Sequence, residues 1–467
     1  MATRRDQLQS YQFMTQRVIS ALVMRETDPQ QSPLRRGIGA VFGGLMVAVL
    51  VAAGFGVYGI LTKVGSGKWK VSGSVVIEKE TGASFVYLDG VLYPTLNYAS
   101  AMLAAGRPNP QVFRVAGNSL GTVPRGTTVG IAGAPDSLPT VKNRVGLPWT
   151  VCATPGADSS GRGVSTVALA VARVPTGGRQ LGDEGLLVSD ATQGMTYLVW
   201  RGRRHLVQES RTVVPALFGA VNPTPAGTAW LNALPAGVDI EAIRFPDRGE
   251  RSPAVPGQKI GDVLLATTAS GPQHYLVLDD GLAPVTPVQV AILRAGYPVE
   301  PTPATVAEVT AAPKSARLRQ PAGEAPPPAT PPALVTPGNG DPLCAVTRDA
   351  RTAPTIQVGG TVPGIDTAAP TVATTTGGTP LADRVLVPTG RIAVVRVLAG
   401  PDAQAGSYHL VTDLGIRYAV PAPAVLPLLG YPADGAVDVP AALLSRIPTG
   451  PTLDPRAAVN PAAAVAQ

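Results

Sequence analysis

YLVLDDGLAPVTPVQVAILRAGYP, from Tyr275 to Pro298, decides the fold that we predict, because the chain carries a second version of it. That version, HLVTDLGIRYAVPAPAVLPLLGYP, runs from His409 to Pro432 and aligns over 24 residues without a gap. Both stretches share a Leu-Val pair, an Asp, a Gly, a Pro in the middle and a closing Gly-Tyr-Pro. Such self-similarity is the sequence signature of a repeat architecture.

The opening pattern of these stretches occurs four times in the chain. Each copy has an apolar pair, three further residues and then a glycine; the four turn glycines are Gly90, Gly202, Gly281 and Gly415. A second glycine follows 16, 17, 15 and 15 residues later, at Gly106, Gly219, Gly296 and Gly430. A proline closes each copy, at Pro124, Pro235, Pro313 and Pro448. This spacing predicts four repeats of one structural unit.

Each copy predicts a short β/α unit. The apolar pair heads a strand, and the first glycine permits a tight turn into a partner strand. The next stretch holds a short helix that the second glycine ends, as in PVQVAILRAG (Pro287–Gly296). A unit of this size cannot bury its apolar face alone, so we expect the units to pack on neighbours.

One segment predicts a membrane protein. The stretch IGAVFGGLMVAVLVAAGFGVYGIL, from Ile38 to Leu61, has no charged residue over 24 positions. As a helix it reaches roughly 36 Å, which is enough to cross a hydrocarbon core of about 30 Å. It is too long and begins too late for a cleaved signal peptide, and no other such stretch follows. We therefore predict a single transmembrane helix over Ile38–Leu61.

The residues before this helix predict an amphipathic helix on the cytoplasmic side. Apolar residues recur at spacings of three and four, at Leu8, Tyr11, Met14, Val18 and Leu22. The arginines of this leading tail outnumber the lysines just beyond the span, which favours a cytoplasmic N-terminus. The helix is suited equally to docking on a partner and to lying on an anionic membrane surface.

Cysteine usage supports an extracytoplasmic position for the rest of the chain. Cys152 and Cys344 are the only two cysteines, and both follow the predicted span. Two lone thiols fit a disulfide in an oxidising compartment better than a metal site, which needs more ligands. Each cysteine lies in a strand-like insert between repeats, so we predict a central β-domain built from both inserts and joined by a Cys152–Cys344 bond.

The composition and motifs argue against several function classes. The net charge of +7 is spread over 467 residues without a basic stripe, so we expect no nucleic-acid binding. GNSLG (Gly117–Gly121) lacks the strand and helix of a nucleophile elbow, and GSGKWK (Gly65–Lys70) lacks the Ser or Thr of a phosphate loop. The three histidines and the Asp279-Asp280 pair lie beside predicted turns. We therefore expect no catalytic, cofactor or metal site, and no enzyme.

Four stretches together resemble EccB, the single-span membrane component of the actinobacterial type VII (ESX) secretion system. They are YQFMTQRVISALVMR (Tyr11–Arg25), PLRR (Pro33–Arg36), IEKETGASFVYLDGVLYPTLNYASAMLA (Ile77–Ala104) and PWTVC (Pro148–Cys152). The resemblance implies a short cytoplasmic helix, one transmembrane helix and an extracytoplasmic domain of four repeats around a central β-domain with a disulfide. It also implies assembly with the EccC ATPase, EccD and EccE, contact with the mycosin protease, and homo-oligomers within the membrane complex.

We therefore predict a single-pass protein of the cell (inner) membrane, whose large C-terminal domain is extracytoplasmic, α+β and β-rich. The expected division of the chain is a cytoplasmic amphipathic helix (1–37), the transmembrane helix (38–61), a juxtamembrane segment with repeat one (62–126), the first part of the central β-domain (127–190), repeat two (191–237), a connector with repeat three (238–319), a Pro-rich linker (320–340), the second part of the central β-domain (341–403), repeat four (404–450) and a flexible tail (451–467). The expected function is a structural core subunit that scaffolds the secretion complex. The alternative is a membrane-anchored module that binds peptidoglycan or another envelope glycan.

Overall fold

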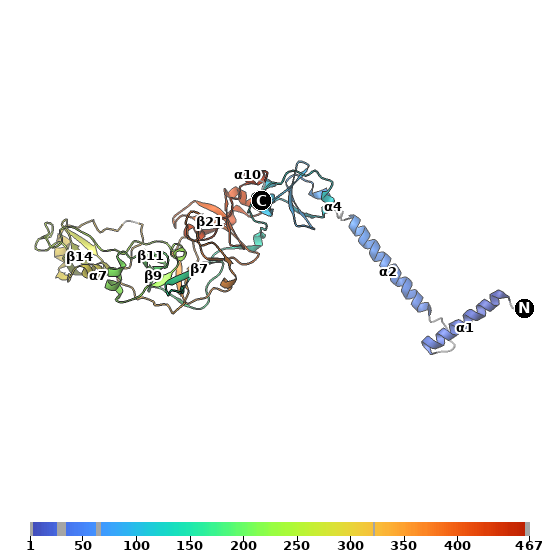
Figure 1. Ribbon diagram of the computed structural model, residues 1–467, viewed down its shortest axis with the longest axis horizontal. Coiled ribbons are helices and arrows are strands. Elements are labelled where there is room, and N and C mark those ends of the chain that lie inside the picture. The colour runs from blue at the N-terminus through green and yellow to red at the C-terminus, as the bar shows by residue number, and fades with distance from the viewer. Residues whose placement is uncertain (1–2, 26–33, 62–66, 321–322, 463–467) are drawn as a thin grey trace. The chain divides into compact units, whose positions relative to one another are not determined.

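The computed structural model describes residues 3–25, 34–61, 67–320 and 323–462. The chain divides into two compact units, Met1–Trp69 with Asn118–Leu120, and Lys70–Gly117 with Gly121–Gln467. The second is called the sheet-rich unit below. Figure 1 shows the chain and labels some of its elements.

The first unit begins with two long helices, α1 (Arg4–Met24) and α2 (Leu34–Leu61), followed by the short 3₁₀ helix η1 (Gly67–Trp69). The start of α1 is capped locally, because the Thr3 N–H donates to Asp6 Oδ2 at 2.9 Å. The apolar residues predicted to form a stripe on α1 are all exposed: Leu8, Tyr11, Met14, Val18 and Leu22.

Helix α2 contains the predicted membrane span. Among the described residues it is the one helix long and apolar enough to cross a bilayer, over Gly37–Tyr58. Large apolar side chains between Ile38 and Tyr58 are exposed; Val41 and Phe55, for example, are 71% and 73% accessible. An uncharged helix with apolar side chains on all sides is stable in lipid and not in water.

Four small sheets of the sheet-rich unit share one strand order. In each, the first strand lies between the second and the fourth, and the third strand lies beside the second. The second and third strands pair antiparallel, whereas the fourth pairs parallel to the first. A parallel return requires a crossover connection, and in each sheet that crossover contains a short helix.

The bounds of these elements follow the chain. The first small sheet has β1 (Ser74–Glu78), β2 (Ser84–Leu88), β3 (Val91–Pro94) and β4 (Val112–Val115), with α3 (Tyr98–Ala104) and α4 (Gly117–Leu120). The second has β9 (Gly185–Asp190), β10 (Thr196–Trp200), β11 (Arg203–Leu206) and β12 (Thr224–Ala226), with α5 (Ser210–Phe218) and α6 (Thr228–Leu231). The third has β13 (Val263–Thr268), β14 (Gly271–Val277), β15 (Leu282–Val285) and β16 (Thr302–Ala304), with α7 (Pro287–Gly296) and α8 (Val306–Ala311). The fourth has β21 (Ile392–Leu398), β22 (Gly406–Thr412), β23 (Arg417–Val420) and β24 (Val437–Pro440), with the 3₁₀ helix η4 (Pro423–Leu429) and α9 (Ala441–Leu444).

A larger sheet of seven strands, called the central sheet below, combines two distant parts of the chain. Its strand order is β19-β20-β7-β6-β17-β18-β8. The strands from the earlier part are β6 (Trp149–Ala157), β7 (Gly163–Val171) and β8 (Arg179–Gln180). The strands from the later part are β17 (Leu343–Thr347), β18 (Thr355–Val358), β19 (Ala369–Pro370) and β20 (Arg384–Leu386). The remaining short elements are η2 (Val141–Asn143), β5 (Arg144–Val145), η3 (Ile365–Thr367), η5 (Ala433–Gly435) and α10 (Pro455–Ala458).

The small sheets bury their apolar faces in shared cores. One core joins the first and fourth small sheets through residues such as Leu103 of α3 and Leu426 of η4. Another joins the second and third, where Val213 of α5 packs in one cluster with Ile292 of α7. The largest core joins the central sheet to the second and fourth small sheets around Trp149 and Trp230. The predicted class, one apolar helix followed by a sheet-rich α+β unit, is confirmed at this level.

The structure differs from the predicted boundaries at two strands. The sequence analysis assigns β9 and β21 to the central β-domain, within 127–190 and 341–403. In the structure β9 pairs with β10 and β21 pairs with β22, so both are first strands of small sheets. The repeating sequence pattern begins at the apolar pair, which lies on the second strand of each small sheet. The pattern therefore gave no indication that the preceding strand belongs to the same sheet.

The C-terminal segment is also packed rather than flexible over its described part. Leu453 and Ala458 are fully buried in the core that joins the first and fourth small sheets. The Leu453 N–H donates to Ala419 O at 2.8 Å, and the Ala462 N–H donates to Thr128 O at 2.8 Å. The expectation of a flexible tail is wrong for residues 451–462, and residues 463–467 lie outside the described part of the chain.

The described part of the Pro-rich segment, residues 323–340, lies against the small sheets. The Gly185 N–H donates to Ala333 O, and the Val335 N–H donates to Gly185 O, at 2.8 and 2.9 Å. The Val288 N–H donates to Ala329 O at 3.0 Å. Because these bonds tie it to the second and third small sheets, the described part of the segment is a component of the fold.

Candidate functional site

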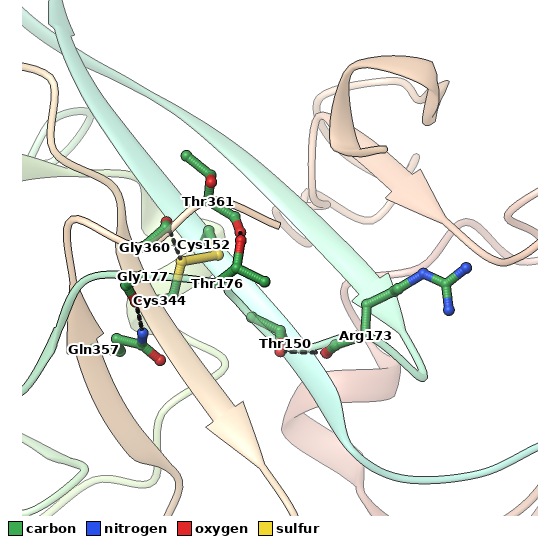
Figure 2. The surroundings of a disulfide bond; sticks show 9 residues. All are labelled: Thr150, Cys152, Arg173, Thr176, Gly177, Cys344, Gln357, Gly360 and Thr361. Carbon is green, nitrogen blue, oxygen red and sulfur yellow. Dashed lines mark hydrogen bonds between the residues drawn. A yellow bond between two sulfur atoms is a disulfide. The ribbon is translucent and has the colours of Figure 1, made fainter. Parts of the chain in front are cut away.

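The two cysteines lie opposite each other on neighbouring strands of the central sheet. Cys152 of β6 and Cys344 of β17 are direct partners in the antiparallel register, with Cα atoms 4.0 Å apart. Their sulfur atoms are 2.09 Å apart, and Figure 2 shows the bond between them. The sequence separation is 192 residues, so this bond closes a loop that contains the second and third small sheets.

Loops on both sides hold the strands around the disulfide in place. The Thr176 N–H donates to Thr361 O at 2.8 Å, and the Thr361 N–H donates to Thr176 O at 3.1 Å. The Gln357 amide nitrogen donates to Gly177 O, and Cys344 Sγ lies 3.8 Å from Gly360 O (Figure 2). Both cysteines are buried, Cys344 completely. The loop ends of the two inserts are therefore held together by hydrogen bonds beside the disulfide.

The four predicted turn glycines all have the left-handed backbone that favours glycine. Their φ values are +87° at Gly90, +73° at Gly202, +139° at Gly281 and +72° at Gly415. Each lies between the second and third strands of a small sheet. Space is restricted at two of them: a Cβ on Gly202 would lie 2.0 Å from Pro354 O, and one on Gly281 would lie 2.4 Å from Pro313 O.

The closing prolines occupy one structural position in the four small sheets. Each proline carbonyl accepts a hydrogen bond from the N–H of a residue in the third strand, at 2.8 to 3.0 Å; the pairs are Leu92–Pro124, Arg204–Pro235, Leu282–Pro313 and Arg417–Pro448. The residue two positions after each proline donates back to the same third-strand residue; these donors are Gly126, Gly237, Ser315 and Gly450. We call this pair of hydrogen bonds the proline clip. It covers the outer edge of each third strand.

The clips contain a contact that the sequence analysis missed. In three of them the donor glycine lies against a ring of the third strand; a Cβ would come within 2.2 to 2.3 Å of Tyr93, His205 or Tyr418. In the third small sheet the ring position is Ala283 and the donor is Ser315. A small donor residue accompanies a large ring, and a larger donor accompanies a small side chain. The signal in the sequence was the Gly or Ser two residues after each closing proline.

The residues weighed for catalysis do not come together. Ser119 of GNSLG bonds only its neighbour Asn118, at 3.4 Å, among the hydrogen bonds of the described residues. Asp279 and Asp280 both pair with Arg317, which lowers the pKa of Asp279, chiefly through the hydrogen bond. Part of GSGKWK, residues 65–66, lies outside the described part of the chain. Within the described residues no three His, Cys, Asp or Glu side chains lie close enough to hold a metal.

The three histidines lie in three different small sheets, His205 in β11, His274 in β14 and His409 in β22. His205 is completely buried, and its Nδ1 lies 2.8 Å from Val238 O. Burial lowers the pKa of His205 and, together with the charge of Arg417, lowers the pKa of His409 to about 4. These rings are neutral at pH 7 and lie in separate small sheets.

Comparison with known proteins identifies the family. The family described as "Type VII secretion system ESX-1, transport TM domain B" (EccB) matches residues 1–467. The ESX-1 secretion system ATPase EccB1 of Mycolicibacterium smegmatis (strain MKD8) is 32% identical over 324 residues, which cover 66% of this chain and 65% of the relative. The ESX-3 secretion system ATPase EccB3 of Mycobacterium tuberculosis (strain CDC 1551 / Oshkosh) is 28% identical over 442 residues, covering 89% and 80%.

Two solved structures share the fold. A chain of an intact ESX-5 inner membrane complex matches with a TM-score of 0.64 and 26% identity, over 100% of this chain and 97% of that one. The EccB3 dimer from the ESX-3 core complex matches with a TM-score of 0.61 and 28% identity, over 83% and 100%.

The relatives' names overturn one prediction. The EccB1 and EccB3 relatives are both named ATPases, which points to an enzyme. The prediction that this chain is not an enzyme is therefore wrong. It rested on several missing motifs, the phosphate-loop pattern among them, and a sequence motif is only one of the ways in which a protein can bind a nucleotide.

The extent of the matches decides what can be concluded. The chain spans 65% and 62% of the lengths of two relatives, an EccB1 and an EccB5, which is less than two thirds. The family match covers every residue from 1 to 467, including α1, α2 and the sheet-rich unit. The chain therefore belongs to the EccB family of type VII secretion systems, as the resemblance predicted.

Proposed function

We propose that this chain is a structural core subunit of an ESX-type inner membrane complex and scaffolds its extracytoplasmic part. The observation that carries the proposal is the likeness, over the full length of the chain, to a chain of the ESX-5 inner membrane complex. A related structure is titled the periplasmic assembly of that complex, and it matches over 86% of this chain at 26% identity. The large sheet-rich unit is suited to holding neighbours, because shared cores and a disulfide join its five sheets.

In this proposal α2 crosses the inner membrane once. Residues 1–37 lie in the cytoplasm, and residues from about 62 onward lie on the periplasmic side. The single crossing is supported by the uncharged, exposed stretch Gly37–Tyr58 of α2, and the orientation is supported by the arginines of the leading tail. A disulfide between Cys152 and Cys344 fits an oxidising compartment.

The four small sheets are four repeats of one β/α unit around the central sheet. Their common strand order, the left-handed turn glycine and the proline clip support this interpretation. The repeat boundaries then begin earlier than the sequence predicted in the second and fourth repeats, at β9 and β21. The disulfide joins β6 to β17 in the central sheet. It therefore holds together the two ends of the chain segment that contains the second and third repeats.

The proposed partners are the EccC ATPase, EccD, EccE and the mycosin protease, with further copies of this chain. The exposed apolar stripe of α1 supports docking on a cytoplasmic or membrane neighbour, because five large apolar side chains in water are unfavourable. The EccB3 relative was solved as a dimer, which supports self-association.

Affinity purification tests this function. The tagged full chain is extracted from membranes in mild detergent, and the co-eluting proteins are identified. We expect EccC, EccD and EccE in the eluate of the parent chain. A matched variant carries Leu8→Glu, Met14→Glu and Leu22→Glu on α1, and we expect it to lose its cytoplasmic partners.

The opposite result favours the envelope-binding alternative. If the full chain elutes without any ESX subunit and binds purified cell wall saturably, the scaffold proposal is wrong. A chain that binds both the wall and the ESX subunits would keep the scaffold role.

The relatives' names add ATP hydrolysis as a second candidate activity. The purified full chain is assayed for phosphate release with ATP and magnesium, after depletion of any co-purified EccC. Turnover that follows the amount of this chain across column fractions would support the activity. Turnover that disappears with EccC would assign it to that subunit instead.

A further inference from the structure

The fourth strands of the small sheets share one outward position. Arg114, Pro225, Pro303 and Asp438 each lie three residues before the helix that follows the strand. Their partners in the parallel register are Ile77, Ser189, Leu265 and Arg396 of the first strands. The four residues are therefore structurally equivalent, although they comprise a cation, two prolines and an anion.

The hydrogen bonds of β4 show which of its groups are turned outward. The Val75 N–H donates to Gln111 O at 2.9 Å, and the Lys79 N–H donates to Val115 O at 3.0 Å. In a parallel ladder alternate residues of a strand bond to the same neighbour, so Gln111, Phe113 and Val115 face β1. Val112 and Arg114 consequently direct their N–H and C=O groups away from the sheet, at its open edge.

The equivalent edge is blocked or occupied in the other small sheets. Pro225 and Pro303 have no N–H, so they cannot donate to an added strand. Strand β12 also lies against β6 and β7 of the central sheet. In the fourth small sheet Arg396 binds the Asp438 carboxylate at 2.6 and 2.8 Å, and Arg351 approaches it at 3.7 Å.

The contact between Arg351 and Asp438 shows that this position of the fourth strand can bind a group from outside its sheet. Arg351 belongs to the loop between β17 and β18, outside the fourth small sheet. Its guanidinium also donates to Pro401 O at 2.6 Å, so a segment from elsewhere in the chain is anchored at the charge on this edge. At the equivalent position the first small sheet carries the opposite charge, Arg114.

Arg114 has no such neighbour. It is exposed, and the ion pairs found among the described residues do not include it. Val112 beside it is 40% accessible. Both residues line a hollow of about 680 Å³, together with Tyr98, Asp136 and Leu138. This edge thus combines free backbone groups, an unpaired cation and space for side chains.

We propose that β4 is the docking edge for an extended, acidic segment of a partner polypeptide. The segment adds a strand by hydrogen bonding to the outward backbone groups of Val112 and Arg114, and one of its carboxylates pairs with the Arg114 guanidinium. Its alternate side chains enter the hollow beside the strand. The inference rests on the proposed function, because a scaffold needs a partner for such an edge.

The test uses the full chain in detergent micelles and two labelled, end-blocked peptides, Val-Glu-Val-Glu-Val and Val-Lys-Val-Lys-Val. Binding is measured by fluorescence anisotropy, and the protection of the Val112 and Arg114 amides by hydrogen exchange. We expect the acidic peptide to bind and to protect both amides. Arg114→Glu and Arg114→Pro should weaken its binding by about tenfold or more, since the first reverses the charge and the second removes the outward N–H.

Arg114→Pro is a controlled change because Pro225 and Pro303 occupy the equivalent position in folded sheets. Arg391→Glu is the matched control for charge, because Arg391 is exposed and lies outside this edge. It should bind the acidic peptide like the parent chain. Arg114→Glu should prefer the lysine peptide over the acidic one.

Three outcomes would overturn the proposal: equal binding of both peptides, unchanged binding by Arg114→Glu, or protection of the two amides that rises with chain concentration in the absence of peptide. The last would mean that a second copy of this chain occupies the edge. The proposed function fails separately, if the full chain co-elutes with no ESX subunit. Failed peptide binding by a chain that still co-elutes with those subunits removes only this edge.

Discussion

At the scale of single residues, the proline clips show how one contact constrains two positions. Gly126, Gly237 and Gly450 lie outside the left-handed region, so the demand for glycine there is one of space and not of backbone conformation. A ring on the third strand fills the volume that a side chain would need. In the third small sheet the small side chain is Ala283 on the strand, which leaves room for the Ser315 side chain in the clip.

The coupling between these positions is measurable. Gly450→Ser places a side chain within 2.3 Å of the buried Tyr418 ring, and we expect it to lower the free energy of unfolding by about 1–3 kcal/mol, the usual cost of overpacking. In a Tyr418→Ala background, which reproduces the Ala283–Ser315 pair, the same change should cost much less. A double-mutant cycle by urea denaturation measures the difference. Additive effects would mean that the ring does not decide the residue at 450.

A second prediction concerns pH and His409. Burial, with the charge of Arg417, lowers the pKa of His409 from 6.5 to about 4, and its Nε2 lies 3.2 Å from Ser407 Oγ. The folded chain binds this proton less readily than the unfolded chain does. The contribution of His409 to stability is therefore complete above pH 6.5 and is lost as the pH falls from 6.5 to about 4.

Replacing the ring removes this dependence. His409→Gln stays neutral, so the fall in melting temperature between pH 7 and pH 4.5 should be smaller for the variant than for the parent chain. Thermal denaturation at both pH values checks this. Identical pH slopes for parent and variant would show that His409 titrates normally in the folded chain.

At the scale of elements, short segments far from a sheet in sequence complete its core. The segment around α10 is the clearest case, since Leu453 and Ala458 are fully buried between the first and fourth small sheets. Asp454 caps α10 through the Arg456 N–H at 2.9 Å. The Ala/Pro composition of this segment gives little indication of that role.

Removing the Leu453 side chain tests the role of the segment. Leu453→Ala should lower the free energy of unfolding by roughly 2–5 kcal/mol and raise proteolysis after residue 450, because it leaves a cavity. Val459→Ala, at a side chain that is 47% accessible, is the matched control and should change little. Limited proteolysis with mass spectrometry gives the readout. Equal resistance of both variants would contradict a packed C-terminal segment.

The central disulfide acts at the same scale. The chain-entropy treatment gives roughly 5 kcal/mol for closing a loop of this length. Cys152→Ala with Cys344→Ala should lower the denaturation midpoint, and either single substitution should lower it by a similar amount. Non-reducing peptide mapping of the parent chain provides the control. Free thiols in protein isolated from the envelope would contradict the bond.

At the scale of the whole molecule, the uncharged stretch Gly37–Tyr58 of α2 is expected to hold the chain in the membrane. Val47 and Leu50 lie near the middle of the Gly37–Tyr58 stretch and are 60% and 62% accessible. Each arginine at the centre of a membrane span costs roughly 2.5–3.5 kcal/mol. Val47→Arg with Leu50→Arg should therefore release a large share of the chain from carbonate-washed membranes. Val47→Leu with Leu50→Val is the control, and equal retention of both variants would contradict a membrane span.

Sequence by itself determined the features that depend on neighbours along the chain. The span Ile38–Leu61 follows from a run of uncharged residues, and the turn glycines follow from backbone sterics at single positions. The spacing of glycines and prolines located the turn between the second and third strands of each small sheet but not the first strands of two of them. Four stretches sufficed to name the family. The prediction that the chain is not an enzyme failed, because it was based on missing motifs, whereas relatives are named ATPases.

Only the tertiary structure decided the features that depend on pairing between distant strands. It assigned β9 and β21 to small sheets, placed Cys152 opposite Cys344 in register, and packed Leu453 into a core far from it in sequence. It also placed Arg114, Pro225, Pro303 and Asp438 at equivalent positions of the four small sheets, which the glycine and proline spacing did not indicate. The physical reason is that hydrogen-bond register and side-chain volume are properties of two segments together, whereas hydropathy and backbone preference belong to one.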